Sequence, residues 1–206
     1  GKSTLVNTIM GHPKYVVSAG DIIFDGKKIN DLKVDERARR GIFMSFQYPE
    51  EIQGITVENF LRNAKAAVTG KKSGILAFRR ALKEKLKLLK IDDSYAKRYL
   101  NVGFSGGEKK KNEILQMAVL EPKLAMLDET DSGLDVDAVR IVSEGVSKLR
   151  TEDNSVLIIT HHNNILEYLK PDYVHILVNG KIVKTGDASL AEEIEENGYD
   201  KFKALA

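Results

Sequence analysis

A chain of 206 residues, with 42% hydrophobic and 30% charged residues, is long enough to bury the core of one substantial domain and is not mainly disordered. The absence of cysteine excludes disulfide bonds, thiolate zinc sites and iron–sulfur clusters held by the chain's own sulfur atoms. The formal charge of +2 is too small to indicate a nucleic-acid-binding protein, and no apolar stretch approaches the ~20 residues that span a bilayer.

The chain opens on Gly1-Lys2-Ser3-Thr4, and residues 5–10 that follow are predicted to be helical. The opening matches only the last three positions of the phosphate-binding P-loop pattern G-x-x-x-x-G-K-[ST]. We therefore expect a longer protein in which a strand, the first glycine and most of the loop precede this point. A lysine, hydroxyls and free amides at a helix start suit a triphosphate with its magnesium, although a frayed chain end explains the tetrapeptide alone equally well.

Two short β regions are expected next. Residues 15–29 have the pattern of short strands around an Asp25-Gly26 turn, and the apolar run 41–46 has the length of a strand. Gln47 ends that run, and its amide can accept from a metal-bound water and donate to a phosphate.

From about residue 56 to residue 117, apolar residues at helical spacing predict a helical block, whose basic outer face we interpret as solvated rather than RNA-binding. Within this block Ser105 precedes Gly106-Gly107-Glu108 and a periodic stretch. Ser105 is therefore predicted to cap a helix whose exposed amides admit an anion, and a plain capping box explains the same residues about as well.

Residues 123–127 and 155–159 are predicted to be buried strands joined by a helix over 135–149, which makes a parallel β-α-β unit. Beyond it, residues 173–185 are expected to form a hairpin around Asn179-Gly180.

Polar residues follow both buried strands, at the sheet edge where such proteins bind ligands. Asp128 is placed to hold magnesium through water, and Glu129 to orient or deprotonate an attacking water. His161, after the second strand, is placed to donate to a phosphate oxygen. Taken singly, an acidic pair that starts a loop and a structural histidine at the rim are the plainer alternatives.

The motifs occur in the order found in the ATP-binding cassette (ABC) ATPases, and the resemblance covers essentially the whole chain. They are Gly1-Lys2-Ser3-Thr4, Gln47, Ser105-Gly106-Gly107-Glu108, residues 124–127 with Asp128-Glu129, Ser132-Gly133-Leu134-Asp135 and Thr160-His161. The resemblance implies an α/β fold: a P-loop NTPase core with a parallel sheet, a small antiparallel β region and an inserted helical subdomain. It divides residues 1–206, a single ABC ATPase domain, into a nucleotide-binding core, 1–47 and 118–206, and a helical subdomain with the signature motif, 48–117.

The resemblance also implies the cofactors ATP and Mg²⁺ and a role for each matching residue. The P-loop (Walker A) residues would bind the nucleotide: Gly1, Lys2 on the β and γ phosphates, Ser3 on magnesium, and Thr4 by the α phosphate. Asp128 (Walker B) and Gln47 would complete the magnesium site, Glu129 would be the general base, and Gln47 and His161 would sense the γ phosphate. In a head-to-tail homodimer, Ser105, Gly106 and Gly107 would close over the partner copy's nucleotide, and Asp135 would lie in the loop that crosses the interface.

Within the family, the wording of residues 41–49, 101–110, 128–135 and 170–175 is similar to the SufC group, the soluble ATPases of the SUF iron–sulfur cluster assembly system. That implies an ATP hydrolase, cytoplasmic or in a plastid stroma, that powers conformational change of SufB- and SufD-type scaffold proteins without binding nucleic acid or entering a membrane. Two alternatives stay open: the nucleotide-binding subunit of an ABC membrane transporter, and a non-catalytic interaction module, which the incomplete P-loop makes plausible.

Overall fold

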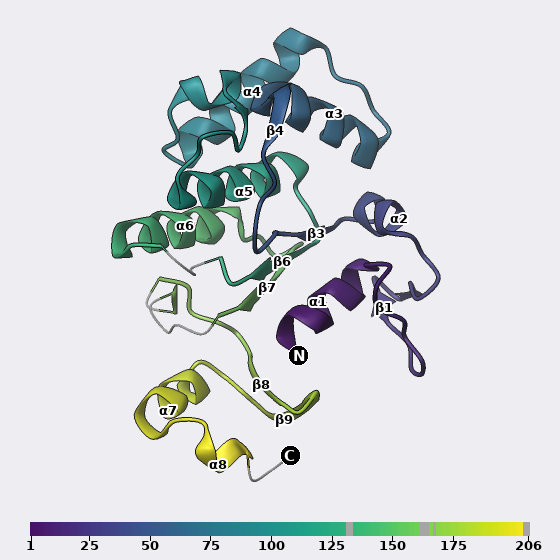
Figure 1. Cartoon of the computed structure of the whole chain (residues 1–206), viewed down its shortest axis with the longest axis vertical. Coiled ribbons are helices and arrows are strands. Elements are labelled where there is room, and N and C mark those ends of the chain that lie inside the picture. Colours follow the sequence, from purple (N-terminus) through teal and green to yellow (C-terminus); the bar gives the residue numbers. More distant parts are fainter. Residues whose placement is uncertain (131–133, 161–164, 167, 204–206) are drawn as a thin grey trace.

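The computed structural model describes residues 1–130, 134–160, 165–166 and 168–203 (Figure 1). The helices are α1 (Lys2–Met10), α2 (Val34–Arg39), α3 (Val57–Thr69), α4 (Ile75–Leu88), the 3₁₀ helix η1 (Asp93–Lys97), α5 (Gly106–Leu120), α6 (Val136–Leu149), α7 (Ser189–Asn197) and α8 (Asp200–Lys203). The strands are β1 (Ile23–Phe24), β2 (Lys27–Lys28), β3 (Ile42–Met44), β4 (Ile52–Thr56), β5 (Tyr99–Leu100), β6 (Leu124–Asp128), β7 (Ser155–Ile159), β8 (Val174–Val178) and β9 (Lys181–Gly186).

A parallel sheet in the order β3-β6-β7 lies at the centre, and the register that pairs β6 with β7 runs from Leu124–Ser155 to Asp128–Ile159. The predicted parallel β-α-β unit, β6-α6-β7, is confirmed. Because strand side chains alternate between faces, Met126 packs toward Val6 of α1 while Leu127 packs toward Leu115 of α5. The sheet is therefore covered by helices on both faces, as Figure 1 shows.

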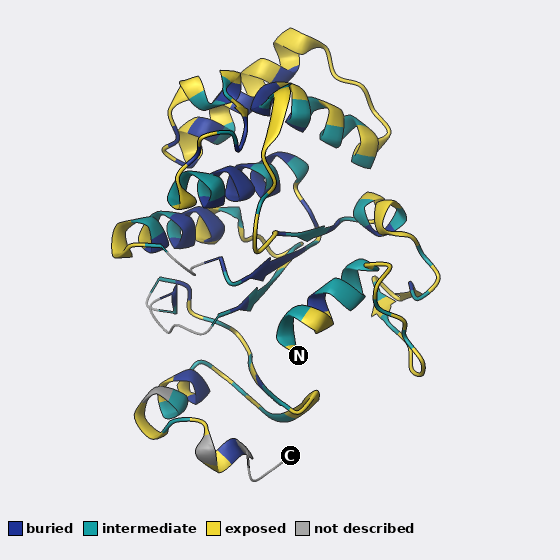
Figure 2. Cartoon of the chain, viewed as in Figure 1, coloured by how far each residue is buried: buried dark blue, intermediate teal, exposed yellow. Residues whose placement is uncertain are grey.

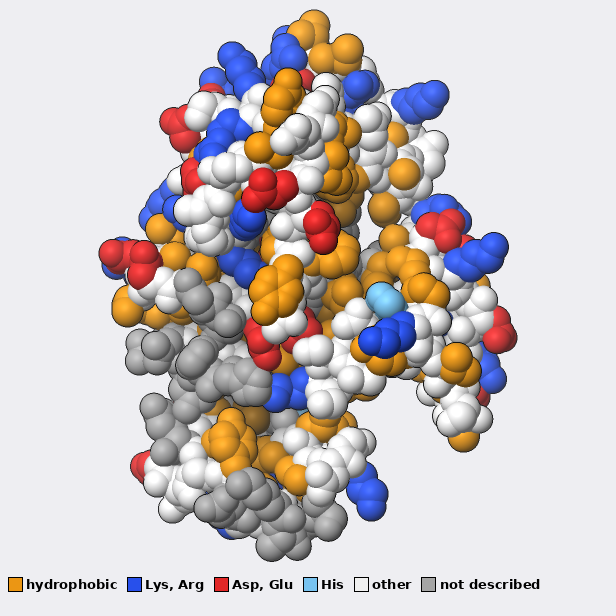
Figure 3. All heavy atoms as spheres, in the orientation of Figure 1, with side chains coloured by type: hydrophobic (Ala, Val, Ile, Leu, Met, Phe, Trp, Pro, Cys, Tyr) orange, Lys and Arg blue, Asp and Glu red, His pale blue; other side chains and the backbone are white. Residues whose placement is uncertain are grey.

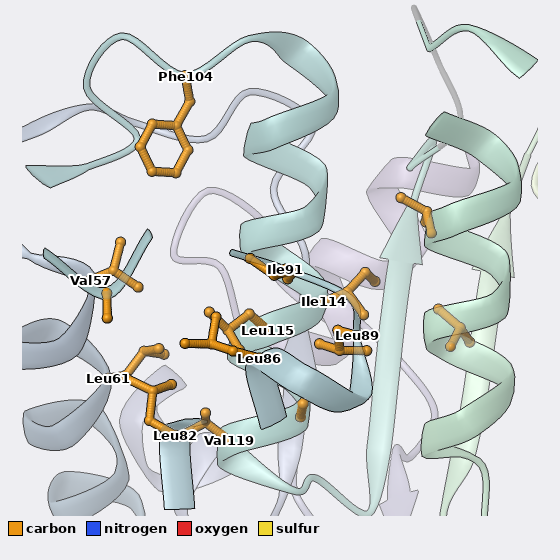
Figure 4. Close-up of a cluster of buried hydrophobic side chains, with 14 of the residues drawn as sticks. Val57, Leu61, Leu82, Leu86, Leu89, Ile91, Phe104, Ile114, Leu115 and Val119 are labelled. Carbon is orange, nitrogen blue, oxygen red and sulfur yellow. The ribbon is translucent and has the colours of Figure 1, made fainter. Parts of the chain in front are cut away.

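The larger core lies between the sheet and α3 to α6 (Figure 4). In α4, Phe78, Leu82 and Leu86 are all less than 5% exposed, and Leu89 follows on the same face, so the predicted helical spacing is confirmed. Burial is concentrated in the central strand β6 and in α5 and α6, as Figure 2 shows.

The prediction of an entirely helical block from residue 56 to residue 117 is wrong in part. The two-residue strand β5 and the 3₁₀ helix η1 interrupt it, and β5 pairs with β4 in an antiparallel ladder. A strand of two residues is too short to show its alternation, and an irregular register between Ile52 and Thr56 hides the pattern of β4.

Many cations of the lobe formed by α3 and α4, where Figure 3 shows Lys and Arg side chains gathered, have acidic partners. These ion pairs are Lys65–Glu121, Arg79–Glu58, Lys83–Asp93 and Lys85–Glu121. The pairing suits the interpretation of this surface as a solvated, ion-paired helix face.

The end of α1 is fixed by Arg37 of α2, which is only 3% exposed. Its guanidinium donates, over 2.8 to 3.0 Å, to the carbonyl oxygens of Thr8, Ile9, Asn30 and Leu32. Thr8 and Ile9 lie in the last turn of α1, so two of these bonds supply donors to carbonyls at the helix end. Gly11 follows with a φ of 83°, and a Cβ there would lie 2.8 Å from Arg37 Nε, so the close approach requires glycine.

The C-terminal part packs around a small core of its own, with Ile176, Leu190 and Phe202 buried among β8, β9, α7 and α8. The predicted hairpin is confirmed, since Val178 pairs with Lys181 across a turn in which Asn179 and Gly180 both have positive φ. No helix in the described ranges is long and apolar enough to cross a bilayer.

Leu115→Ala tests the central core. Leu115 is 0% exposed, so its truncation should cost about 2 to 5 kcal/mol of unfolding free energy. Leu76→Ala is the matched control, because Leu76 is 69% exposed and its loss should cost no more than ~0.5 kcal/mol. Urea unfolding followed by circular dichroism measures both, and equal losses would contradict the placement of Leu115.

Candidate functional site

Hydrogen bonds donated by backbone amides align the carboxyl ends of the three parallel strands at one edge. Ser45 N donates to Met126 O over 2.9 Å, and Asp128 N donates to Ser45 Oγ over 3.1 Å. On the other side, Glu129 N donates to Ile159 O over 2.9 Å. The residues that follow β3, β6 and β7 are thereby held beside one another, at the edge where parallel sheets bind ligands.

Gln47 and Glu129, which are 82 positions apart in the sequence, meet at this edge. Gln47 Nε2 donates to Glu129 Oε2 over 2.8 Å. Glu129 has a φ of 50°, in the left-handed region that residues other than glycine rarely adopt. Such a backbone persists only where its surroundings impose it, which is frequent at functional sites. The contact positions a carboxylate and directs an amide group at it.

Asp128, at the same edge, is 4% exposed, and its Oδ1 has no hydrogen-bond partner in the part of the chain that the structure describes. A buried carboxylate oxygen without a partner is unusual and suits a ligand that supplies the missing contact. The oxygen donors of Asp128, Gln47 and Ser3 are of the kind that Mg²⁺ prefers. These residues therefore fit a magnesium ion, which proteins commonly bind through one or two carboxylates together with substrate phosphates.

The opening residues lie at the start of α1. Gly1 is the N-cap, no side chain among the described residues caps the first turn, and that turn carries no acidic residue. Its amides are thus open to an anion. Lys2 and Ser3 are half-buried and Thr4 is exposed, while Val6 packs in one cluster with Met126. This packing holds α1 against the sheet that ends in Asp128.

The second predicted anion site is the corner at the start of α5. Ser105 caps this helix: its Oγ accepts from Glu108 N over 3.2 Å, and Glu108 Oε2 accepts from Ser105 N over 2.8 Å. The predicted N-cap and its capping box are confirmed. Ser105 and Gly106 are exposed, and within the described residues a Cβ on Gly106 would meet nothing within 4 Å. The corner can therefore approach a large ligand or another molecule.

Asp135 lies close to this corner. It caps α6, where its carboxylate accepts from Ala138 N over 2.7 Å. A Cβ on Gly107 would lie 3.5 Å from the Cβ of the same Ala138. The starts of α5 and α6 therefore adjoin, and the structure brings Gly107 and Asp135 to one region of the surface.

Several hydrogen-bond donors stabilise the negative charge of Glu108. Its Oε1 accepts from Arg98 over 2.6 Å and from the hydroxyl of Tyr95 over 2.9 Å. Arg98, then the Ser105 amide, lower the pKa of Glu108 to about 2. Burial, then the carboxylate, raise the pKa of Tyr95 to about 12. With the Arg98 guanidinium 3.9 Å from the Phe104 ring centroid, these contacts stiffen the corner.

The structure adds residues that the sequence did not single out, namely Ser45, Arg98 and a buried ion pair between Lys110 and Glu113. A Lys and a Glu three positions apart in a charged stretch look like surface residues, and only the packing of α5 shows their burial. His161, Ser132 and Gly133 lie outside the described residues. A cavity of about 310 Å³ between α3 and α4 is lined by none of the predicted site residues.

Comparison with known proteins shows which family the chain belongs to. A family model described as ABC transporter matches residues 1–132. The chain is 50% identical to Vegetative protein 296 of Bacillus subtilis, over 98% of this chain and 78% of the relative. It is 51% identical to the probable ATP-dependent transporter ycf16 of Cyanophora paradoxa, over 100% and 81%. These relatives are SufC homologues, which confirms the resemblance to that group.

The fold has solved relatives as well. The ADP conformation of MJ1267, an ATP-binding cassette of an ABC transporter, superimposes with a TM-score of 0.76 at 26% identity, over 99% of this chain and 82% of that chain. The expected α/β cassette fold with a parallel sheet is confirmed.

Glu108→Gln tests the electrostatics of the corner. A carboxyl pKa lowered from 4.5 to about 2 stabilises the folded state above pH 4.5, and this stabilisation disappears as the pH falls toward 2. The variant keeps an acceptor but cannot ionise, so its stability deficit should be full at pH 7 and shrink steadily below pH 4.5. Urea midpoints measured from pH 7 to pH 2 give the result.

Glu84→Gln is the matched control, because Glu84 lies on the exposed face of α4 without an ion pair among the described residues. Its midpoints should follow those of the parent protein at every pH. A constant deficit of Glu108→Gln across the whole range would contradict the ionic role of Glu108.

Proposed function

The chain belongs to the ABC family of ATP-binding cassettes, and we propose that it hydrolyses ATP to power conformational change of the SUF scaffold in iron–sulfur cluster assembly. Two observations support this proposal: the chain shares motif residues with the SufC group, and it is about 50% identical to homologues of that group. The absence of cysteine fits a division of labour in which scaffold proteins, of the SufB and SufD type, supply the cluster ligands.

One observation carries the hydrolytic part of the proposal: Gln47 holds Glu129 at 2.8 Å, beside the buried Asp128. Glu129 is proposed to accept the proton of the attacking water, and Gln47 to orient Glu129 and sense the γ phosphate. Asp128, Ser3 and Gln47 would hold Mg²⁺, which when bound neutralises charge on the phosphate oxygens. His161 is proposed as a second sensor of the γ phosphate.

Nucleotide binding is assigned to the start of α1. Gly1 and the first-turn amides would surround phosphate oxygens, which the positive end of the helix dipole favours. Lys2 would contact the β and γ phosphates, and Thr4 would support the α phosphate. Magnesium and Lys2 would both neutralise negative charge on the triphosphate, so the side chain proposed as the base, Glu129, could lie close to it.

The exposed corner at the start of α5 supports the proposal that two copies of the chain act as a dimer. Ser105, Gly106 and Gly107 are proposed to donate to the γ phosphate held by a second copy of the chain, in a head-to-tail pair. Asp135, which adjoins this corner, would lie in the interface. Phosphoryl transfer requires donors around the whole γ phosphate, and the corner would supply those that one copy's α1 and strand edge lack.

Glu129→Gln in the full-length protein tests the general base. Turnover should fall roughly 10²- to 10⁴-fold, the usual contribution of a general base, while ATP still binds. Glu152→Gln, at an exposed position that belongs to none of the motifs, is the control and should hydrolyse ATP at the parent rate. Steady-state phosphate release and ATP titration measure the two properties, and undiminished hydrolysis by Glu129→Gln would remove the residue from its role.

The name of one relative favours a second candidate function, since ycf16 is called a probable ATP-dependent transporter. The same cassette chemistry would then drive a membrane permease. Co-expression of the full-length protein with SufB- and SufD-type proteins, followed by size-exclusion chromatography, should give one stable complex. Copurification with a multi-span membrane protein, and no complex with the scaffold proteins, would favour the transporter.

A further inference from the structure

The segment that carries Gln47 is fastened to α5 at its first residue. Phe46 N donates to Glu113 Oε1 over 2.6 Å, and Lys110 Nζ donates to Phe46 O over 3.0 Å. The two side chains therefore grip both polar backbone atoms of the residue that precedes Gln47. This fixes the peptide from which the Gln47 side chain departs.

Lys110 and Glu113, which hold Phe46, are both buried and form an ion pair with each other. Lys110 Nζ lies 3.0 Å from Glu113 Oε2, and the side chains are 7% and 2% exposed. An unpaired buried charge is costly, so each group needs its partner. Burial raises the pKa of Glu113, and Lys110 and the Phe46 amide oppose that rise. The pair thus has little freedom to take other geometries.

The far end of the same segment is fastened to α5 as well. Asn101 Nδ2 donates to Glu50 O over 2.8 Å, and Asn112 Nδ2 of α5 donates to Asn101 Oδ1 over 2.8 Å. Lys109 Nζ of α5 reaches Glu51 Oε1 over 2.8 Å. Gln47 therefore lies on a short segment that is attached to α5 at both of its ends.

We propose that Lys110 and Glu113 are positioning residues, which hold both backbone polar groups of Phe46 and so set the Gln47 amide against Glu129. The proposal rests on the proposed ATPase function and names two further residues on which the proposed general base depends.

The hydrogen bond between Gln47 and Glu129 tolerates little displacement of either side chain. The bond from Gln47 to Glu129 is 2.8 Å long, and a displacement of about 1 Å takes such a bond out of range. Misplacement of that size in a catalytic group lowers rates by up to ~10²-fold. Loss of the grip on Phe46 should therefore reduce kcat rather than the affinity for ATP.

Two double variants of the full-length protein separate positioning from stability, because neither leaves one charge of the Lys110–Glu113 pair buried without its partner. Lys110→Gln/Glu113→Gln keeps a donor and an acceptor for Phe46, whereas Lys110→Met/Glu113→Leu keeps neither. Apolar replacement of a buried ion pair is often neutral or stabilising, so the second variant is expected to fold. Urea unfolding and circular dichroism verify this for both.

Steady-state hydrolysis should show kcat reduced ~10- to 10²-fold in the Met/Leu variant, with KM for MgATP within about 3-fold of the parent. The Gln/Gln variant should keep kcat within about 3-fold. Arg79→Met/Glu58→Leu, which removes an ion pair between α3 and α4, is the matched control and should leave kcat unchanged. Equal kcat values for the Gln/Gln and Met/Leu variants would overturn the proposal.

A combination with Glu129→Gln gives a second, independent readout. If the pair acts through Gln47 and Glu129, the Met/Leu change should lower kcat by less than about 2-fold in the Glu129→Gln protein, because groups that act as a unit are not additive. A full additional loss in that protein would show a general structural effect and refute the positioning role. Failure of Glu129→Gln itself to lower kcat would refute the general base instead, so the two failures are distinguishable.

Discussion

The register of the parallel sheet is the constraint on which the site depends. Because β6 is hydrogen-bonded to β3 on one side and to β7 on the other, three strand ends reach the same edge. The hydroxyl of Ser45 bonds the amide of Asp128, and the amide of Glu129 bonds the carbonyl of Ile159, so the turn after β6 has no freedom to slide. A slip of one residue would send Asp128 to the opposite face of the sheet.

Local chemistry in the sequence was sufficient to predict a large part of this structure. The β6-α6-β7 unit follows from apolar runs and length, the cap at Ser105 from its residue type, and the hairpin at Asn179-Gly180 from its turn residues. These features depend on neighbours in the chain. The strand β5 escaped prediction because two residues carry no periodicity.

Contacts between distant segments could not be predicted in the same way. The spacing of 82 residues between Gln47 and Glu129 says nothing about their hydrogen bond, and motif order only placed them in one site. The buried pair of Lys110 and Glu113 is harder still, since the sequence around it reads as an exposed charged helix. One helix carries two glutamates in opposite environments: donors lower the pKa of Glu108, and burial raises that of Glu113.

The four carbonyl contacts of Arg37 have a consequence at the opposite end of α1. Ordering a flexible segment on binding consumes part of the interaction energy, often several kcal/mol for a whole helix. Because Arg37 and the tight bend at Gly11 already hold the carboxyl end, and Val6 the middle, the helix is preorganised before any ligand arrives. Contacts that its amino end would make with the proposed nucleotide would then contribute to affinity almost undiminished, so the hydrogen bonds of Arg37 at one end of the helix would favour anion binding at the other.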